Sequence, residues 1–442
     1  MQKRADRRRT VLSWGAGLAM AAGLVALAHS SAASASGSAR PKSEAMGLAP
    51  GVPIMPVKDV KPGMKGHAVT VFSGTQSDRF EIEVIDVVPD YRTGQDAILF
   101  ESPDPRLQHS GIVGGMSGSP IFIDGKLVGA LAYGYRFNKD PLGGITPIEN
   151  MLEVGNLPFR PDALPHHTAR SREGTAAWAD VMLGLDHDQL PPRRRPHEVG
   201  EMAKVSGLTQ LSVPMSVSGM SRRTGHWLGD QLGIPVVQGG GSGAPASSAG
   251  KATAKAGKKK WKAGDSVSVL LIGGDNSAAP NGTVTWVGGK NGERLLAFGH
   301  PMFGDGPSQL PVTDAHVHTI IKSVERSVKL SSPLSVQGTM VQDRQPAISL
   351  RTDIDTPMIP VTTTLIPADP DLPTRNYKST VARHLDLTPN LVAATLADAV
   401  EEGAPDATEL IAIFDQRIVM ETSKGRRTLD VHDETFFTRG VS

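Results

Sequence analysis

A single turn constrains the local fold of this chain more firmly than any other feature. Two apolar runs, Pro120 to Ile123 and Lys126 to Tyr133, flank the pair Asp124-Gly125. Both residues of this pair tolerate the positive φ angles of a tight turn, so the segment predicts a β-hairpin. Glycine (48 residues) and proline (33 residues) are frequent throughout the chain. They favour many short strands joined by turns over a helical bundle.

Further strands follow from the hydrophobic pattern. Phe80, Ile82 and Val84 alternate with Glu81, Glu83 and Ile85, the period of two that is typical of a half-buried strand. Other short apolar runs predict strands at 97–100, 267–272, 283–287, 295–298, 312–321, 346–350, 410–414 and 418–421. We predict two helices. One begins at Thr146-Pro147, with Glu149 completing a capping box, and the other covers residues 390–402 and ends at Gly403.

The N-terminus has the features of an export signal. Basic residues from Lys3 to Arg9 precede an apolar stretch from Val11 to Ala28, and Ala33-Ser34-Ala35 offers a cleavage site. Arg8-Arg9 also fits a twin-arginine signal. We therefore expect export to the periplasm, the cell envelope or the medium. An uncleaved anchor is the alternative, and no other segment is long and apolar enough to span a membrane.

The chain divides by composition into seven parts. We expect a signal peptide over 1–35, a flexible tether over 36–55, a β-rich part with a serine motif over 56–160, an intermediate segment over 161–238, a disordered linker over 239–262, a second β-rich part with a histidine motif over 263–355, and a mixed α/β C-terminal region over 356–442.

Composition excludes several functions. The formal net charge is +1 and only 5% of residues are aromatic, so a nucleic-acid partner is not expected. The chain has no cysteine, which excludes disulfides, thiolate metal sites and a cysteine nucleophile. It also lacks phosphate-binding and dinucleotide-binding motifs. We therefore predict no cofactor.

The motif that carries chemistry is the run from Gly114 to Pro120, just before a predicted strand. A nucleophilic hydroxyl needs a tight turn to project it, and flanking glycines permit that backbone and a close approach of substrate. Ser117 is therefore the candidate nucleophile. The backbone N–H groups of Gly115 and Ser117 are the candidate oxyanion hole.

A serine nucleophile needs a base to remove its proton. His300 lies where the apolar run from Leu295 to Phe298 ends, and a glycine-rich loop follows it. A histidine that emerges from a strand into a loop is well placed to face a cleft. We predict that His300 is the general base of Ser117.

At these residues the chain resembles the SpoIVB family of sporulation-type serine peptidases, over roughly residues 60–155 and 265–345. The clearest parts of the resemblance are the run from Gly111 to Pro120, the following segment from Asp124 to Ala130, and Phe298-Gly299-His300. The resemblance implies a mainly β fold, a trypsin-like double β-barrel, with endopeptidase activity. It also implies that Asp104, shortly before the serine motif, orients His300. Asp305 and Asp314 are alternative orienters.

The chain departs from the family pattern in the order of its motifs. In the sporulation peptidase the histidine precedes the serine, whereas here Ser117 precedes His300. Triads recur in several chain orders, so this order is compatible with the same chemistry. Pro301 also replaces the glycine that usually follows the histidine, and no PDZ module is evident.

Weaker candidates have ordinary structural interpretations. His316 and His318 could share one face of a strand and bind zinc, but no third ligand is evident, so no metal is predicted. His67 is a second base candidate, and Lys126 is expected to be a solvated residue at a strand start.

We therefore predict an exported serine endopeptidase that acts on protein or peptide substrates, with self-cleavage as a further possibility. The alternative is a catalytically inactive β-barrel protein that binds peptides or envelope partners.

Overall fold

The computed structural model of the chain describes residues 52–138, 140–159, 208–239, 258–403, 409–422 and 424–438. The expected signal peptide lies outside these residues, as do most of the tether, most of the linker, and residues 161–207 of the intermediate segment. The chain forms two compact units. Of the described residues, those up to 403 belong to the main unit, and residues 409–422 and 424–438 belong to the second unit.

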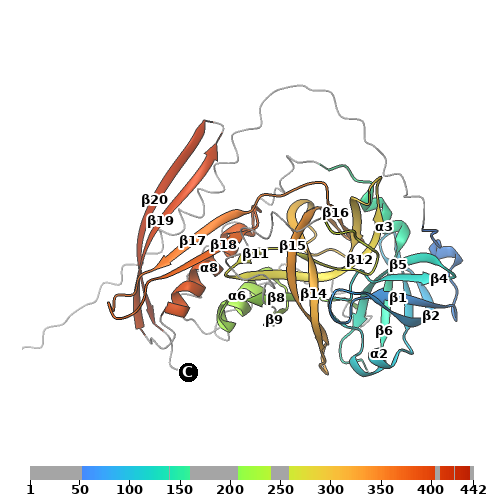
Figure 1. The fold of residues 1–442 in the computed structure, drawn as a ribbon. Helices are drawn as coiled ribbons and strands as arrows, with labels where there is room; N and C mark the ends of the chain where they lie inside the picture. The colour runs from blue at the N-terminus through green and yellow to red at the C-terminus, as the bar shows by residue number, and fades with distance from the viewer. Residues whose placement is uncertain are drawn as a thin grey trace, which may run out of the picture. The chain divides into compact units, whose positions relative to one another are not determined.

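The chain is mainly β, as predicted, and the main unit contains a six-stranded antiparallel barrel (Figure 1). Its neighbouring strands, in order around the barrel, are β1 (Lys65–Thr70), β2 (Asp78–Arg92), β3 (Gln95–Glu101), β6 (Leu142–Pro147), β5 (Lys126–Tyr135) and β4 (Pro120–Ile123). Because β4 pairs with both β5 and β1, the barrel closes on itself. Beyond β4, residues 133–135 of β5 pair with a further short strand, β7 (Leu208–Gln210).

The predicted hairpin is confirmed. Strands β4 and β5 pair through Ile123 and Lys126, and the two turn residues both have positive φ, 50° at Asp124 and 73° at Gly125. The alternation along β2 is also confirmed, since Phe80, Ile82 and Val84 are buried in one apolar core. The short helix α2 (Pro105–Ser110) adds Leu107 to that core.

A second, larger sheet follows in the same unit, drawn in yellow to orange in Figure 1. Six of its strands pair in the order β10 (Ser266–Val269), β14 (Gly306–Ile321), β15 (Val328–Arg344), β16 (Ala347–Arg351), β13 (Arg294–Ala297) and β12 (Ser277–Gly288). Strand β12 also pairs with β10, so this series of antiparallel pairings returns to its first strand. The sheet extends further through β11 (Ile272–Gly274), β18 (Arg375–Val381) and β17 (Ile359–Leu365), and through β8 (Met215–Ser218) and β9 (Val236–Gln238).

The long strands of this sheet were underestimated from the sequence. Strand β15 was not predicted, and β14 begins six residues before the predicted strand. Their pairing contains several register shifts, for example between Val312 and Thr313. These bulges interrupt the simple alternation of apolar and polar residues on which the prediction depended.

The predicted capping box at Thr146 is wrong. Thr146 belongs to β6, and helix α3 (Ile148–Gly155) begins two residues after it, with Pro147 at the N-cap position. Glu149 instead accepts a hydrogen bond from the backbone N–H of Val57 at 2.9 Å. The Thr146 hydroxyl is therefore available for another contact, described below.

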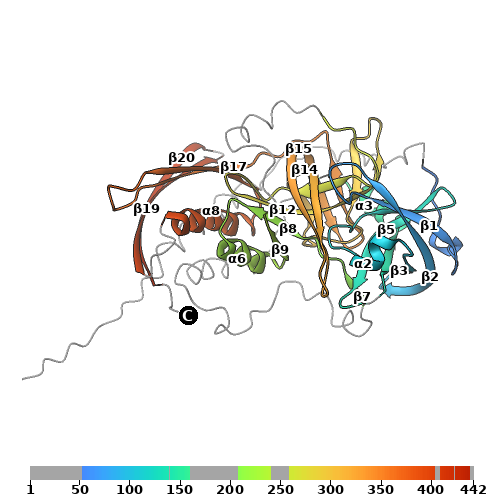
Figure 2. The ribbon, with the colours of Figure 1, turned by 60° about the horizontal axis from the view of Figure 1, so that its bottom comes forward.

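Two longer helices pack beside one another in the main unit, as Figure 2 shows. Helix α8 (Thr388–Gly403) matches the prediction. Helix α6 (Arg222–Leu232) was not predicted; Ser221 caps it and Gly233 ends it in the left-handed conformation. Among the described residues, no helix combines the length and the apolar character needed to cross a membrane.

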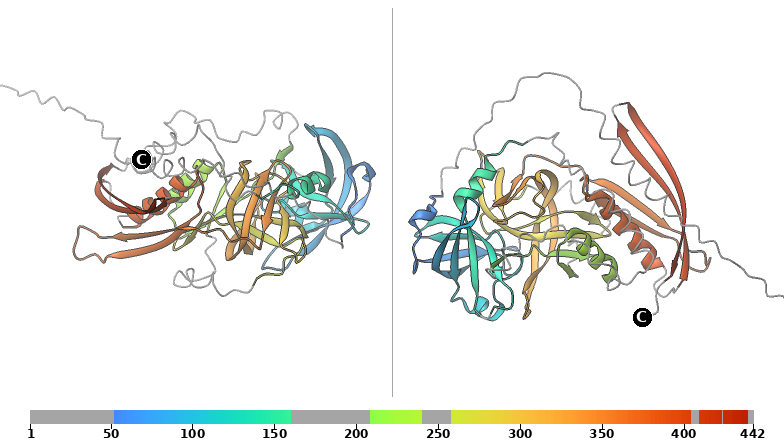
Figure 3. Two further views of the ribbon diagram at one scale, coloured as in Figure 1. Left: turned by 90° about the horizontal axis from the view of Figure 1, so that it is seen from above. Right: turned by 180° about the vertical axis from the view of Figure 1, so that it is seen from behind.

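The second unit is described only by a long hairpin of β19 (Glu409–Thr422) and β20 (Gly425–Thr438), which Figure 3 shows as a two-stranded ribbon. The two strands predicted at 410–414 and 418–421 are therefore one continuous strand. Its partner β20 was not predicted.

Candidate active site

The Ser117 turn, residues 113–119, is held by main-chain hydrogen bonds from both sheets. Gly118 N–H donates to Leu131 O on β5 at 2.8 Å, and Ser117 O accepts from Thr283 N on β12 at 2.9 Å. Gly115 and Gly118 have φ of 90° and 93°, which side chains rarely adopt. A Cβ at Gly118 would also collide with the carbonyl oxygen of Thr283. The glycines of this motif are therefore required by the fold itself.

The His300 loop, residues 298–304, follows β13. Like the Ser117 turn, it is hydrogen-bonded to β12. Phe298 N–H donates to Thr283 O at 3.3 Å, while Thr283 N–H is the donor to Ser117 O. Thr146, the residue freed from capping, donates its hydroxyl to Gly299 O at 2.6 Å. Two segments nearly two hundred residues apart in the chain are thus joined through the backbone of Thr283.

Ser117 and His300 are both fully buried, with 0% of each residue exposed. The Oγ of Ser117 and the Nε2 of His300 have no hydrogen-bond partner among the described residues, and they do not bond to each other. Burial lowers the pKa of His300 to about 4. The imidazole is therefore neutral near pH 7, which is the form that a general base requires.

The other ring nitrogen of His300 is occupied. Its Nδ1 lies 2.7 Å from the side-chain amide nitrogen of Gln210 and 2.8 Å from Pro301 O. The Pro301 carbonyl accepts only from a protonated Nδ1, which is the tautomer that leaves Nε2 as the acceptor. The Gln210 amide can donate to Nδ1 only in the other tautomer, and it also donates to Pro301 O at 2.8 Å. Gln210 was not anticipated from the sequence, since its partner is 90 residues away.

Asp104 does not contact His300 in this structure. Its carboxylate caps α2 by accepting from Arg106 N–H at 2.8 Å, and it pairs with the Arg106 guanidinium at 2.8 Å. The hydrogen bonds to Arg106 lower the pKa of Asp104 below its ordinary value. An aspartate directly before Pro105 is a typical start of a helix, a local signal that the resemblance to the peptidase family overrode.

The alternative orienters also have other partners. Asp305 Oδ2 lies 3.4 Å from Nε2 of His384, and Asp314 accepts from the Ser335 N–H and hydroxyl at 2.9 Å. Nδ1 of the His300 imidazole thus faces the Gln210 amide and the Pro301 carbonyl.

A different aspartate, Asp343 on β15, holds the His300 loop. Its carboxylate accepts the backbone N–H groups of Met302, Phe303 and Gly304 at 2.7 to 3.0 Å. Asp343 is fully buried, and burial raises its pKa to about 6 although these three donors act in the opposite direction. The sequence gives no local sign of this role.

One of the two N–H groups of the predicted oxyanion hole is already hydrogen-bonded. The Gly115 N–H donates to Ser212 O at 3.2 Å, whereas the Ser117 N–H makes no hydrogen bond with a described residue. A substrate carbonyl can therefore use both groups only if the Ser212 carbonyl leaves Gly115.

A buried lysine packs against the Ser117 turn. Lys329 on β15 is fully buried, its side-chain carbons lie against Gly115, and its Nζ donates to the Thr70 hydroxyl at 2.8 Å. Burial lowers the pKa of Lys329 to about 7. The hydroxyl of Thr283 donates to Gly115 O at 3.2 Å, so the turn is also tied down on this side. Lys126, by contrast, is exposed at the start of β5, as interpreted from the sequence.

The remaining candidates have structural partners. His67 stacks on Phe122 at 5.4 Å between ring centres, and His318 Nε2 contacts the Ser332 hydroxyl at 2.7 Å. The Ser119 hydroxyl donates to Met116 O at 2.6 Å. In the part of the chain that the structure describes, no three acidic or histidine side chains gather as a metal site.

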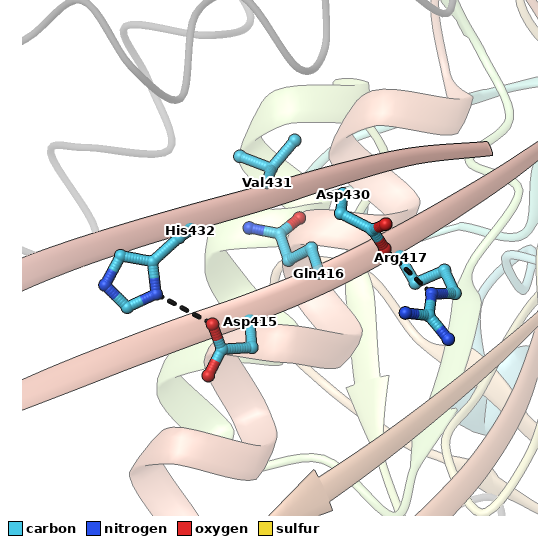
Figure 4. Close-up of a pocket in the computed structure, with 6 residues that line it drawn as sticks. All are labelled: Asp415, Gln416, Arg417, Asp430, Val431 and His432. Atoms are coloured by element: carbon cyan, nitrogen blue, oxygen red, sulfur yellow. Dashed lines mark hydrogen bonds and ion pairs between the residues drawn. The ribbon is translucent and has the colours of Figure 1, made fainter.

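A shallow polar pocket on the β19–β20 hairpin belongs to the second unit (Figure 4). Two cross-strand pairs line it, with His432 Nδ1 and Arg417 Nε each 2.7 Å from a carboxylate oxygen, of Asp415 and Asp430 respectively. The hydrogen bond to Asp415 raises the pKa of His432. These exposed pairs satisfy one another and hold no nucleophile.

The main unit thus holds a serine on a glycine turn and a neutral histidine on a loop that meets the same residue, Thr283. Residues 26–152 match the family model described as SpoIVB peptidase S55. The matched range contains Ser117 and Asp104 and ends well before His300. No curated protein and no solved structure matches the chain.

Proposed function

We propose that this protein is an exported serine endopeptidase of the SpoIVB type, with Ser117 as nucleophile and His300 as general base. One observation carries the proposal. The Ser117 turn of the family-matched region and the neutral His300 are joined through Thr283, and each presents an unpaired polar atom in a buried site. Unpaired buried polar atoms cost stability, so they are expected where function requires them.

The proposed reaction is acyl transfer through a covalent intermediate. Ser117 Oγ attacks the carbonyl carbon of a peptide bond while His300 Nε2 takes the hydroxyl proton. The tetrahedral oxyanion is stabilised by the N–H groups of Ser117 and Gly115. His300 then gives the proton to the leaving amine, and water releases the acyl group by the same steps in reverse roles.

The groups around His300 would act as positioning residues. Pro301 O directs a proton to Nδ1, which keeps Nε2 basic, and Asp343 fixes the loop that carries the ring. In this arrangement the Pro301 carbonyl takes the place of the aspartate of a standard triad, and the Gln210 amide donates to that carbonyl at 2.8 Å. We expect a slower enzyme than one with a carboxylate at Nδ1, because the imidazolium that forms during reaction is less well stabilised.

The proposal extends to the fold and the location of the protein. The closed series of pairings from β10 to β12 would be the second barrel of a double-barrel peptidase, with Thr283 between the two. The basic and apolar residues 3–28 support export. Substrates would be proteins or peptides, including segments of the chain itself.

A specific observation favours the inactive alternative, a β-barrel protein that binds peptides. Ser117 Oγ and His300 Nε2 are not hydrogen-bonded to each other, and neither is exposed. Catalytic hydrogen bonds are often formed only when substrate binds, so the two hypotheses must be separated by experiment.

The experiment compares the wild-type protein with Ser117→Ala and His300→Gln. A fluorophosphonate probe and an unfolded protein substrate are offered to each, and adducts are located by peptide mass analysis. We expect an adduct on Ser117 and substrate cleavage in the wild type, with cleavage reduced roughly 10⁴- to 10⁶-fold in both variants. A folded wild-type protein that neither forms the adduct nor cleaves, but still binds peptides as Ser117→Ala does, would support the binding alternative.

Stability gives an independent measurement on the same variant. Ser117→Ala removes a buried hydroxyl that has no partner. Its free energy of unfolding should be unchanged or higher by up to about 2 kcal/mol, because the desolvation cost of the hydroxyl disappears. Ser119→Ala is the matched control, since it removes a buried hydroxyl that donates to Met116 O, and it should be less stable than the wild type. A large loss of stability in Ser117→Ala would indicate a structural role for this serine.

A further inference from the structure

A short segment before β8 lies along the same edge of β5 as the Ser117 turn. Strand β7 (Leu208–Gln210) pairs antiparallel with residues 133–135 of β5, and Leu211 N–H donates to Ala132 O at 2.8 Å. The residue of β5 just before Ala132 is Leu131, and its carbonyl accepts from the Gly118 N–H. Residues 208–212, called the cover segment below, therefore continue along β5 directly beyond the nucleophile turn.

The cover segment contacts both halves of the candidate active site. Its Ser212 carbonyl accepts from the Gly115 N–H, one of the two groups assigned to the oxyanion hole. Its Gln210 amide contacts Nδ1 of His300 at 2.7 Å and donates to Pro301 O at 2.8 Å. Within two residues the segment thus spans from the general base to the oxyanion donors.

This placement is the one that an extended peptide substrate would need. A peptide that adds to a sheet edge forms main-chain hydrogen bonds with the edge strand, and its reacting carbonyl must reach the oxyanion donors. The cover segment makes both kinds of contact with its own backbone. Since Ser117 and His300 have no exposed surface, some element must move before any peptide reaches them.

We propose that residues 208–212 occupy the substrate position as an internal autoinhibitory strand, which must leave the edge of β5 before a peptide can bind. This inference rests on the proposed peptidase function. It assigns the regulation of the site to a named segment and predicts that substrates bind as an added antiparallel strand beside residues 132–135.

The energetics suit a segment that opens. Strand β7 has only three residues, and Thr209 and Gln210 are partly exposed. The Ser212 hydroxyl and Gln210 Oε1 are buried without partners among the described residues, which weakens the docked state. Leu208 and Leu211 are buried and favour it. Opening of such a short edge strand is therefore far less costly than opening of the barrel.

The absence of cysteine from the chain permits a clean test by a disulfide lock. Gly134 and Thr209 are directly opposite in the β5–β7 register. Opposite residues of antiparallel strands have Cα atoms about 4.5 to 5.5 Å apart, within the range of a disulfide. A Cβ at Gly134 would meet neighbours only at ordinary contact distances, the nearest being Leu211 at 3.4 Å. The double variant is Gly134→Cys with Thr209→Cys, and each single variant is its control under the same oxidant.

The measurement is the rate of Ser117 labelling by a small fluorophosphonate, together with cleavage of an unfolded protein. Oxidation of the double variant should slow both by roughly tenfold or more, and reduction should restore both to the level of the single variants. Equal rates in the locked and reduced forms would overturn the inhibitory role of the cover segment while leaving the peptidase function intact.

A second pair of variants tests the opposite direction. Thr209→Pro removes a backbone N–H and fixes φ at an edge strand, whereas Thr209→Ala keeps the N–H and loses only the hydroxyl contact with Gly134 O at 3.3 Å. We expect faster labelling in Thr209→Pro and an unchanged rate in Thr209→Ala, with folding of both verified by circular dichroism. If no form, including folded Thr209→Pro, is labelled or cleaves, the proposed function itself fails, and the inhibitory role fails with it.

Discussion

The Ser117 turn and the His300 loop hold their side chains in different ways. The turn is fixed by main-chain hydrogen bonds, to Leu131 and Thr283, and by glycines in conformations that other residues avoid. The loop is fixed mainly by side chains: Asp343 holds its N–H groups, Thr146 holds the Gly299 carbonyl, and Gln210 holds the ring. A turn made of backbone depends little on pH, whereas a loop held by a carboxylate and an imidazole can titrate.

The largest expected effect concerns the turn. Gly118→Ala places a Cβ against Thr283 O and Phe298 N at positive φ. We expect the free energy of unfolding to fall by about 2 to 5 kcal/mol in urea titrations, combining backbone strain with overpacking. Gly125→Ala is the matched control, because it shares the positive φ but nothing lies within 4 Å of its Cβ. It should lose about 1 to 2 kcal/mol, and equal losses in the two variants would contradict the close packing of the Ser117 turn.

The next effect concerns the pH dependence of the loop. Burial raises the pKa of Asp343 from 3.8 to about 6, so between these values the folded protein binds a proton that the unfolded chain releases. The contribution of Asp343 to stability is therefore greatest below pH 3.8 and is lost as pH rises through 6. Burial lowers the pKa of His300 from 6.5 to about 4, so its contribution is present above pH 6.5 and is lost as pH falls through 4.

The two contributions to the free energy of unfolding oppose each other. Each changes by about 3 kcal/mol between the pKa of the group in the unfolded chain and its pKa in the folded protein. In Asp343→Asn only the contribution of His300 remains. The free energy of unfolding should therefore rise more steeply between pH 4 and 6 than in the wild type. In His300→Gln only the contribution of Asp343 remains, so the free energy of unfolding should fall as pH rises between 4 and 6. Urea unfolding at pH 4, 5 and 6 measures both slopes, with Asp353→Asn as an exposed control. Parallel curves for all variants would contradict the burial of these charges.

The smallest effect distinguishes positioning from stability. Thr146→Val removes the hydroxyl that donates to Gly299 O, and Ser119→Ala removes the one that donates to Met116 O, both at 2.6 Å. Each should cost about 1 kcal/mol of stability. Only Thr146→Val acts on the His300 loop, so it should lower kcat for peptide cleavage more than Ser119→Ala does. Equal kcat values would show that the Gly299 contact does not position the base.

The sequence predicts the turn better than the loop for the same physical reason. The signals of the turn and of the β4–β5 hairpin are local, because positive φ at Gly118 or Gly125 restricts the residue at that position alone. The partner of Ser117 is not local, and His300 was connected to it by the chemistry that a serine nucleophile requires. The structure brings the two segments together through Thr283, which no pattern in the sequence indicates.

The supporting residues of the site were missed because their partners are distant. Lys329 bonds to Thr70 across 259 positions, and Gln210 contacts His300 across 90. Asp104 shows the opposite error. Its local role as a cap before Pro105 could be predicted, yet a distant role was assigned to it from family resemblance. Thr146 shows a third error, since a correct helix start was placed one residue too early and hid its contact with Gly299.

The complete enclosure of Ser117 has a kinetic consequence. Every reaction at its hydroxyl must wait for a local opening, so turnover cannot exceed the frequency with which that opening occurs. A substrate that is bound more tightly or attacked more readily gains nothing beyond this ceiling. The rate of such an enzyme would then be set by how often the cover segment opens, and selection for faster cleavage would change that segment before it changed the catalytic residues.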